Sequence, residues 1–239
     1  MRTTFTRLLK SGITSGIAAV AFTVISACTS PASNRGTSEM QAFEAFFAAN
    51  GDSVSITPRK VRMRALQKMR ETRDSLARYN YLAVASKTCL MSSDIDSGRL
   101  LIQQIVDFTE RQPFSPQLAD LQSECFNMKG NIYARTGHMD SAEVCFRKAY
   151  GQRMQGTRKE VVPDILINLA DANNRLGKLD AGAAWYRRAL LLCDSLNITS
   201  AKKPPIYYGL AQIYVALRDF EQCDYYYNLA ARSLSLIHI

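Results

Sequence analysis

The stretch Gly130–Tyr150 reads GNIYARTGHMDSAEVCFRKAY, in which small and apolar residues recur at helical spacing on both sides of one central glycine. The residues that share a face are Gly130, Tyr133 and Ala134 before that glycine, and Ala142, Phe146 and Ala149 after it. Gly137 is suited to the left-handed conformation that ends a helix, and Asp140 is expected to open the next helix. The stretch therefore predicts an αα-hairpin, which cannot bury its apolar face without neighbours.

Turn residues recur at a nearly constant interval on both sides of this stretch. They are Ser93, Gly137, Gly177 and Arg218, which lie 44, 40 and 41 residues apart. A period near 40 residues with paired helices predicts an all-α solenoid of about four stacked αα-hairpins over residues 79–239. The first hairpin, from Tyr81, fits the pattern least. Gln152–Glu160 and Asn197–Lys203 are the expected linkers, because prolines that can restart a helix follow them.

The order of residues within these hairpins resembles the tetratricopeptide repeat: a small residue, a tyrosine, a glycine turn, an alanine, an aromatic residue and an alanine. The second hairpin fills all of these positions with Gly130, Tyr133, Gly137, Ala142, Phe146 and Ala149. The third has Ala170, Gly177, Tyr186 and Ala189 but departs at Asn173 and Gly182, and the fourth has Ala211, Tyr214, Tyr227 and Ala230 but departs at Arg218 and Cys223. The resemblance implies a protein-binding solenoid. Because the period exceeds the usual ~34 residues, longer second helices or looser linkers are expected.

Residues 1–27 have the pattern of a secretory signal peptide. Three basic residues and no acidic residue precede the apolar run Ile13–Ala27, which ends in small residues. The ending Ile25-Ser-Ala-Cys28 resembles a bacterial lipobox. This resemblance implies lipidation of Cys28 and a membrane-anchored lipoprotein of the bacterial cell envelope that faces the periplasm. An ordinary signal peptide with an incidental cysteine and an uncleaved anchor are the alternatives. No acidic residue precedes Glu39, so nothing resembles an acidic signal for surface display.

Residues 28–57 are predicted to form a linker that contains a short amphipathic helix. A flexible spacer is expected up to Thr37, followed by a helix that Ser38 caps and Gly51 ends. The apolar residues that share one face of this helix are Met40, Phe43 and Phe47. We expect them to dock on the first repeat rather than to meet lipid.

Residues 58–78 are predicted to form a basic helix that starts at Thr57-Pro58. Its basic residues are Arg59, Lys60, Arg62, Arg64, Lys68, Arg70 and Arg73. These cations either lie near anionic lipid head groups or form a solvated face. The formal net charge of the whole chain is +9, with its charges scattered, which favours solubility and does not by itself indicate a nucleic-acid partner.

The sequence carries no recognisable catalytic motif. Its two histidines are His138 and His238, and it has no metal-ligand spacing, nucleophile elbow, phosphate loop or carboxylate pair. We therefore expect no catalysis, no metal and no cofactor. The cysteines after Cys28 form no CxxC pair and are expected to pack as small hydrophobes, although Cys125 and Cys145 could form a disulfide after export.

The first helix of each hairpin is expected to line the concave face of the solenoid, and polar residues recur along it at helical spacing. The candidate partner-binding residues are Asn127, Asn131, Arg135, Asp171, Asn174, Arg175, Tyr208 and Gln212. Asparagine and arginine can hydrogen-bond an extended peptide or hold a carboxylate. The set loosely resembles the carboxylate clamp of peptide-binding tetratricopeptide proteins, although the lysines of that clamp are missing. An ordinary solvated groove is the alternative.

The function predicted from these features is a non-catalytic protein-interaction module held in the bacterial envelope by lipid. The apolar ending, residues 234–239, has no polar cap and resembles an adaptor-derived peptide, which favours a truncated fragment. Similar Bacteroidetes proteins imply an alternative, the periplasmic sensory region of a membrane-bound transcriptional regulator or signalling protein. An enzyme or glycan-binding protein would need a ligand pocket that the sequence does not indicate.

Overall fold

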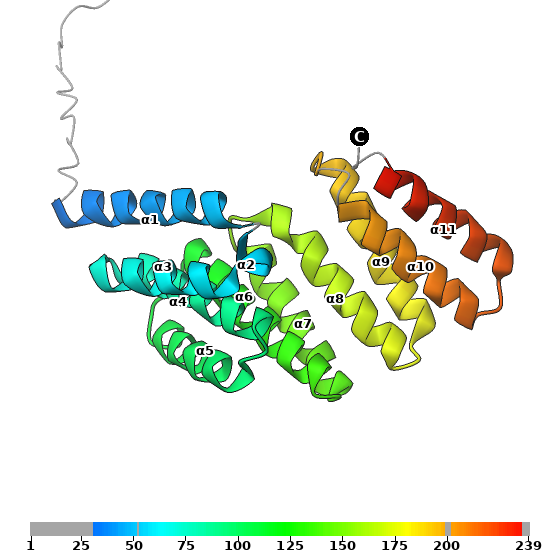
Figure 1. Ribbon diagram of the computed structural model, residues 1–239, viewed down its shortest axis with the longest axis horizontal. Helices are drawn as coiled ribbons and strands as arrows, with labels where there is room; N and C mark the ends of the chain where they lie inside the picture. The colour runs from blue at the N-terminus through cyan, green and yellow to red at the C-terminus, as the bar shows by residue number, and fades with distance from the viewer. Residues whose placement is uncertain (1–30, 52, 199–201, 236–239) are drawn as a thin grey trace, which may run out of the picture.

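The computed structural model describes residues 31–51, 53–198 and 202–235, and every regular element in these ranges is a helix (Figure 1). The N-terminal elements are α1 (Pro31–Asn50), α2 (Ser53–Ile56) and α3 (Pro58–Glu71). The elements that follow are α4 (Ser75–Met91), α5 (Ile95–Thr109), α6 (Pro116–Arg135), α7 (Met139–Gln155), the 3-10 turn η1 (Lys159–Val161), α8 (Val162–Arg175), α9 (Leu179–Ser195), α10 (Lys203–Ala216) and α11 (Phe220–Ser235). The predicted all-α fold is confirmed. The predicted signal peptide and Cys28 lie outside the described residues.

The helices from α4 to α11 pair in chain order into four hairpins within the described residues. The pairs are α4/α5, α6/α7, α8/α9 and α10/α11, and each first helix also contacts the first helix of the next hairpin. Figure 1 shows α6 to α11 following one another along the long axis. The predicted solenoid of stacked hairpins is therefore confirmed, with the first helices forming one continuous layer.

The four predicted turn residues all adopt the left-handed backbone conformation. Their φ angles are 60° at Ser93, 86° at Gly137, 73° at Gly177 and 59° at Arg218. In each turn the next amide donates to a carbonyl five residues earlier, as His138 does to Tyr133 at 2.9 Å. Ser93 and Arg218 adopt this conformation with a side chain, at a cost of about 1–2 kcal/mol each. The residue before α7 is His138, so Asp140 lies in the first turn and does not open the helix.

At two places in the core, an aromatic ring of a second helix meets a glycine of a first helix. Phe146 of α7 is 2 % exposed and lies against Gly130 of α6 in its own hairpin, while Tyr186 of α9 is fully buried against Gly209 of α10 in the next hairpin. A Cβ atom at either glycine would overlap the ring. Close approach at these two positions therefore depends on glycine.

A buried ion pair holds the connection between α7 and α8. The Arg153 guanidinium bonds Asp120 Oδ1 at 2.9 Å and Ser123 Oγ at 3.1 Å, and the Arg153 and Asp120 side chains are 1 % and 3 % exposed. Asp120 Oδ2 also accepts the Thr157 amide at 2.9 Å. The predicted linker Gln152–Glu160 is therefore wrong in its first part: α7 runs to Gln155, and side-chain bonds hold the residues after it. Pairing across 33 residues leaves no local signal in the sequence.

The N-terminal helix differs from its prediction at its start. Because α1 begins at Pro31, the predicted flexible spacer is helical from that residue, and Ser38 lies inside the helix and is not its cap. The predicted end at Gly51 is confirmed. Phe43 and Phe46 pack edge-on against Tyr81 of α4 at 5.1 and 5.2 Å between ring centroids. This docking anchors the helix, and extending a helix already formed costs little.

The predicted basic helix 58–78 is wrong at its C-terminal end. Helix α3 begins at Pro58 after Thr57 as predicted, but it ends at Glu71, and α4 already begins at Ser75. The Asp74 side chain caps α4 by accepting the Ala77 amide at 2.8 Å. Glu39 of α1 accepts the amides of Arg73 and Asp74, which fixes the break between the two helices.

Candidate partner-binding groove

A hollow of about 520 Å³ lies between the first helices α4, α6 and α8. Its lining residues are Lys87, Leu90 and Met91 from α4, Glu124, Asn127, Met128, Asn131, Ala134 and Arg135 from α6, and Asn168 and Arg175 from α8. Asn127, Asn131 and Arg135 are spaced by four residues along α6, which places them on one face of that helix. We refer to this hollow as the groove.

The groove brings together half of the predicted site residues: Asn127, Asn131, Arg135 and Arg175. The others, Asp171, Asn174, Tyr208 and Gln212, do not line it. Tyr208 and Gln212 are exposed on α10, and Asn174 is half-buried on α8. The predicted set is therefore spread along the layer of first helices rather than gathered at one point.

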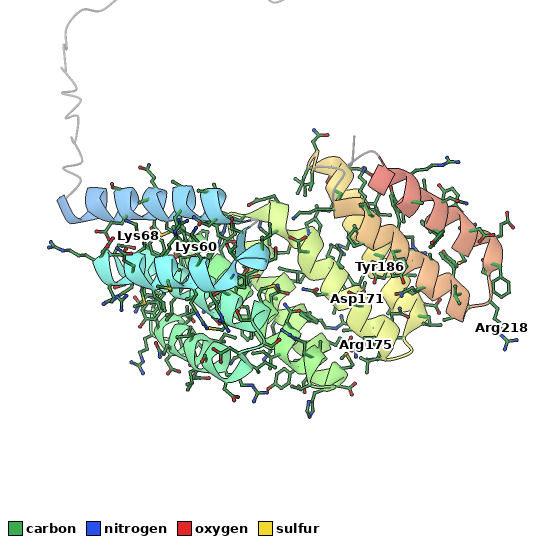
Figure 2. The ribbon with its side chains drawn as sticks, in the orientation of Figure 1. Lys60, Lys68, Asp171, Arg175, Tyr186 and Arg218 are labelled. Carbon is green, nitrogen blue, oxygen red and sulfur yellow. The ribbon has the colours of Figure 1, made fainter. Side chains whose placement is uncertain are left out.

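Asp171 lies at the seam between α8 and α9, where it accepts a hydrogen bond from the Tyr186 hydroxyl. Figure 2 labels Asp171 on α8, with Arg175 one turn nearer the helix C-terminus. Although Asp171 is exposed as a whole residue, desolvation of its carboxylate raises its pKa above the ordinary value, against the opposing effects of Tyr186 and Arg175. Part of its hydrogen-bonding capacity is thus used within the fold.

The two groove arginines tie neighbouring hairpins together. Arg135 donates to the Leu90 carbonyl at 2.5 Å and to Ser93 Oγ at 3.3 Å, and Arg175 donates to the Ala134 carbonyl at 3.5 Å. These contacts leave further guanidinium N–H groups for a ligand, because arginine has five. Both arginines combine a structural contact with remaining donor capacity.

Amide side chains form the middle of the groove. Asn168 donates from Nδ2 to Asn127 Oδ1 at 2.9 Å, which bridges α8 and α6. The Asn127 amide donors and the Asn168 carbonyl oxygen stay available for other partners. Asn131 is half-buried and makes no side-chain hydrogen bond within the described residues. Such amides can pair with a peptide backbone.

The lining residues that sequence reasoning missed include Lys87, Met91 and Asn168. Lys87 lies 3.6 Å from Glu124, and Met91 is 50 % exposed. Lys87 and Met91 belong to the first hairpin, which fits the repeat pattern least, so their alignment with α6 was not evident. Lys87 and Met91 are spaced by four residues and Asn168 lies seven residues before Arg175, so their helical-face spacing could have indicated them.

The groove has an excess of positive charge. Lys87, Arg135 and Arg175 line it together with one acidic residue, Glu124. Burial raises the pKa of Glu124, but Lys87 and Arg153 outweigh that effect and hold the pKa below its ordinary value. Glu124 is therefore ionised at neutral pH, and three cations face one carboxylate.

Helix α1 covers the neighbouring part of α4. A second hollow of about 350 Å³, which shares Lys87 and Glu124 with the groove, is lined by Phe43 and Phe47 of α1 and by Asn80 and Val84 of α4, among others. The predicted docking of the α1 aromatics on the first repeat is confirmed by the packing of Phe43 against Tyr81. The chain's own helix thus borders the groove on the α4 side.

The cations of α3 are mostly solvated. Arg59, Lys60 and Arg64 are exposed, and Figure 2 shows Lys60 and Lys68 on this helix. Arg62 differs, because it bonds Asp94 at 3.0 Å and the Cys89 sulfur at 3.1 Å and so ties α3 to the first hairpin. No helix in the described ranges has the length and apolar character needed to cross a membrane.

The five described cysteines are free thiols. Cys125 and Cys145 do not pair, so the predicted possibility of a disulfide is not realised in this structure. Cys89, Cys125 and Cys193 are buried, and desolvation raises the pKa of the Cys125 thiol. Cys145 and Cys223 are only half-buried, whereas the predicted packing as small hydrophobes would bury them. No cluster of metal-ligating side chains occurs among the described residues.

Comparison with known proteins identifies three segments that match the tetratricopeptide repeat: residues 123–152, 163–195 and 204–233. They coincide with the second, third and fourth hairpins. No curated protein matches the chain. Among solved structures, BtubC (BKLC) from P. vanneervenii is 14 % identical, with a TM-score of 0.45, over 87 % of this chain and 93 % of that chain. Tetratricopeptide repeats are generally non-catalytic scaffolds, and they indicate a protein–protein interaction module.

Proposed function

We propose that this chain, with its three tetratricopeptide repeats, binds an extended segment of a protein partner in the groove between α4, α6 and α8. The observation that carries the proposal is the hollow itself, in which unused polar groups of Asn131, Arg135 and Arg175 converge from two helices. The proposal includes no catalytic step and no cofactor.

The chemistry of the groove fits a peptide rather than a folded surface. The amides of Asn127, Asn131 and Asn168 can donate to and accept from a peptide backbone. Met91 offers an adaptable apolar contact because its thioether chain is flexible. The excess of positive charge favours a segment that carries acidic side chains or a terminal carboxylate.

The outlying predicted residues extend the proposed site. Asp171, Asn174, Tyr208 and Gln212 lie on α8 and α10, in the same layer of first helices as the groove. A partner segment that continues past Arg175 would meet them next. We assign them a weaker, peripheral role, since Asp171 already accepts the Tyr186 hydroxyl.

We also propose that lipid on Cys28 anchors the chain in the bacterial envelope, on its periplasmic side. Support comes from the lipobox-like ending at Cys28, three residues before α1 begins at Pro31. Metabolic labelling with an alkyne fatty acid should mark the chain and not its Cys28→Ser variant, and the label should appear in the membrane fraction. Equal labelling of both would contradict the anchor.

The alternative function is the sensory region of a membrane-bound regulator. One observation favours it: Tyr227 of α11 is 59 % exposed, whereas Phe146 and Tyr186 at the equivalent repeat positions are at most 2 % exposed. An uncovered aromatic position is where a further element would pack. If the gene encodes residues after 239, an apolar run of about 20 residues among them would favour this function.

Site-specific photo-crosslinking tests the groove. A photoreactive phenylalanine analogue at Met91, which lines the groove, should crosslink a partner in cell envelopes, whereas the same group at Met63 of α3, which is 72 % exposed, should not. The adduct at Met91 should disappear when Asn131, Arg135, Asn174 and Arg175 are replaced by alanine. An unchanged adduct in that folded variant, or equal adducts at both positions, would contradict the proposed site.

A further inference from the structure

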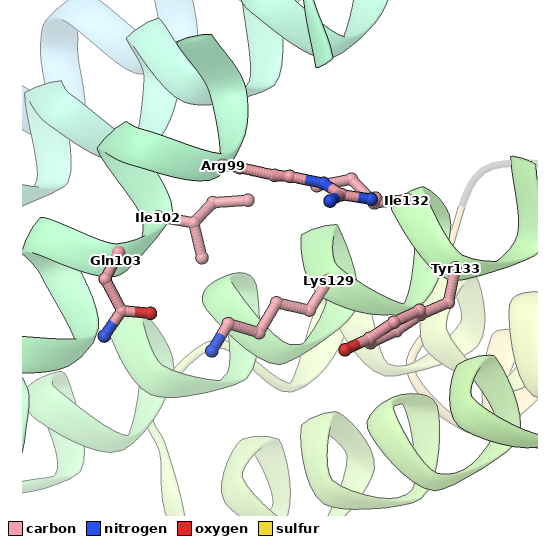
Figure 3. Close-up of a pocket in the computed structure, with 6 residues that line it drawn as sticks. All are labelled: Arg99, Ile102, Gln103, Lys129, Ile132 and Tyr133. Atoms are coloured by element: carbon pink, nitrogen blue, oxygen red, sulfur yellow. The ribbon is translucent and has the colours of Figure 1, made fainter. Parts of the chain in front are cut away.

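A separate hollow of about 230 Å³ lies between α5 and α6 (Figure 3). Its lining residues are Arg99, Ile102 and Gln103 from α5 and Lys129, Ile132 and Tyr133 from α6. Each helix therefore contributes one residue and those three and four positions later, which is the spacing of one helical face. Lys129 and Tyr133 lie on the opposite side of α6 from Asn127 and Asn131, so this hollow is distinct from the groove.

The hollow combines an apolar floor with polar walls. Ile102 and Ile132 are 1 % and 4 % exposed and form its base. In Figure 3 the Arg99 side chain extends along one wall, while Lys129 and Tyr133 extend along the facing wall. Gln103 closes one end. The Arg99 guanidinium and the Lys129 ammonium point toward opposite ends of the hollow. A concave site with an apolar base and a few polar groups around it is the usual form of a ligand site.

The two cations of the hollow lack counter-charges. Neither Arg99 nor Lys129 makes an ion pair with any described residue, and no acidic residue lines the hollow. The acidic residues one turn away on α5 are Asp96, which is exposed, and Asp107, which accepts the Gln103 amide at 2.7 Å. Both side chains are long and flexible enough to turn their charged ends toward one anion in the hollow, which would supply the counter-charge that each of them lacks.

We propose that this hollow binds a phosphate monoester carried on an apolar stem. A phosphate monoester carries close to two negative charges at neutral pH, which matches one arginine and one lysine better than a single carboxylate does. Arginine suits phosphate because its planar fork bonds two oxygens, and the Tyr133 hydroxyl supplies a neutral donor. The isoleucine floor and the Tyr133 ring accommodate the stem.

Calorimetric titration of the full chain at pH about 7.5 tests this, with phenyl phosphate, inorganic phosphate and benzoate as probes. Phenyl phosphate should bind at least about tenfold more tightly than either of the others, because only it has both the dianion and the stem. Equal binding of all three, or no binding of phenyl phosphate, would overturn the proposal.

Matched charge-removal variants locate the binding. Arg99→Gln with Lys129→Gln should weaken phenyl phosphate binding by about tenfold or more. Arg59→Gln with Lys60→Gln removes the same charge from the exposed face of α3 and should leave binding unchanged. Equal loss in both variants would overturn the assignment. Alanine at Asn131, Arg135, Asn174 and Arg175 should leave phosphate binding intact, so failure here and failure of the proposed groove are distinguishable.

The phosphate could belong to a small molecule or to a phosphorylated side chain, and a last comparison separates these sources. Free phosphotyrosine and a peptide that contains phosphotyrosine are titrated in parallel. Equal affinity would assign the hollow to a small-molecule phosphate, and tighter binding of the peptide would assign it to a phosphorylated protein. If neither bound, the proposal would fail.

Discussion

The Arg135 guanidinium donates a hydrogen bond to the Leu90 carbonyl, 45 residues earlier in the chain, at 2.5 Å. One repeat later, Arg175 donates to the Ala134 carbonyl at 3.5 Å. The two contacts are equivalent, since Leu90 and Ala134 each lie three residues before a turn residue, Ser93 and Gly137. In two successive repeats, an arginine at the same position of the first helix thus ties that helix to the C-terminal end of the preceding first helix.

Replacement of Arg135 by alanine should lower the free energy of unfolding by about 1 kcal/mol, because a charge-assisted hydrogen bond at a partly exposed site is lost. Urea denaturation measures this loss. Arg111→Ala is the control, since Arg111 is exposed and its side chain makes no ion pair with described residues. Equal effects of the two substitutions would show that the Leu90 contact contributes nothing.

Arg153→Met should be far more costly, about 3–5 kcal/mol, because it removes the buried cation of Asp120 and leaves only the more exposed Arg158 at 3.9 Å. Thermal and urea unfolding both report this. Combining Arg153→Met with Asp120→Asn should recover part of the loss, since the uncompensated charge is then removed as well. If the double variant were no more stable than Arg153→Met alone, the cost would come from packing rather than charge.

The same pair predicts a pH dependence. Burial alone would raise the pKa of Asp120, but the hydrogen bonds from Thr157 and the charge of Arg153 hold it below its ordinary value. A folded-state pKa below the unfolded value means that the stabilisation is present above the unfolded pKa and is lost as the pH falls through the folded pKa. The free energy of unfolding should therefore decline below pH about 4. Asp120→Asn should show a shallower decline, and an unchanged slope would contradict this assignment.

The turn at Arg218 offers a stabilising substitution. Arg218 is exposed and adopts a φ of 59°, which glycine tolerates without strain. Arg218→Gly should raise the free energy of unfolding by about 0.5–1 kcal/mol, the relief of strain being offset in part by the extra freedom of glycine in the unfolded chain. The reverse substitution, Gly137→Ala, should lower it by a similar amount. A loss of stability in Arg218→Gly would count against strain at this turn.

Replacing the aromatic residues of different repeats should lower the free energy of unfolding by different amounts. Phe146→Ala should cost about 3–5 kcal/mol because it opens a cavity in a closed core. Tyr227→Ala should cost well under half as much, since Tyr227 is 59 % exposed. Urea denaturation of both variants makes the comparison. Equal costs would mean that Tyr227 is covered in solution.

The sequence predicted the repeat architecture well because its signals are local. Gly137 and Gly177 mark turns through backbone conformation, and the small and aromatic residues at helical spacing mark the buried faces. The repeat period alone also predicted turns at Ser93 and Arg218, although both of these residues carry a side chain. Such features need only a window of about one repeat to be read.

The features that sequence missed depend on contacts between distant segments. The break between α3 and α4 is fixed partly by Glu39, 34 and 35 residues before the amides it accepts. Asp120 meets Thr157 across 37 residues. Lys87 joins the groove only because the first hairpin stacks on the second. No local pattern in the sequence encodes these pairings, so only half of the predicted site residues line the groove.

The Tyr186–Gly209 contact has a mechanical consequence for the third and fourth hairpins. The tyrosine ring lies where a side chain at position 209 of α10 would overlap it, so sliding of α9 along α10 by one residue or more would bring a neighbouring side chain against the ring. A change in the angle between the hairpins leaves the ring in place. A change of curvature by such a pivot would therefore keep the polar side chains of α8 and α10 at the same relative positions along the stack.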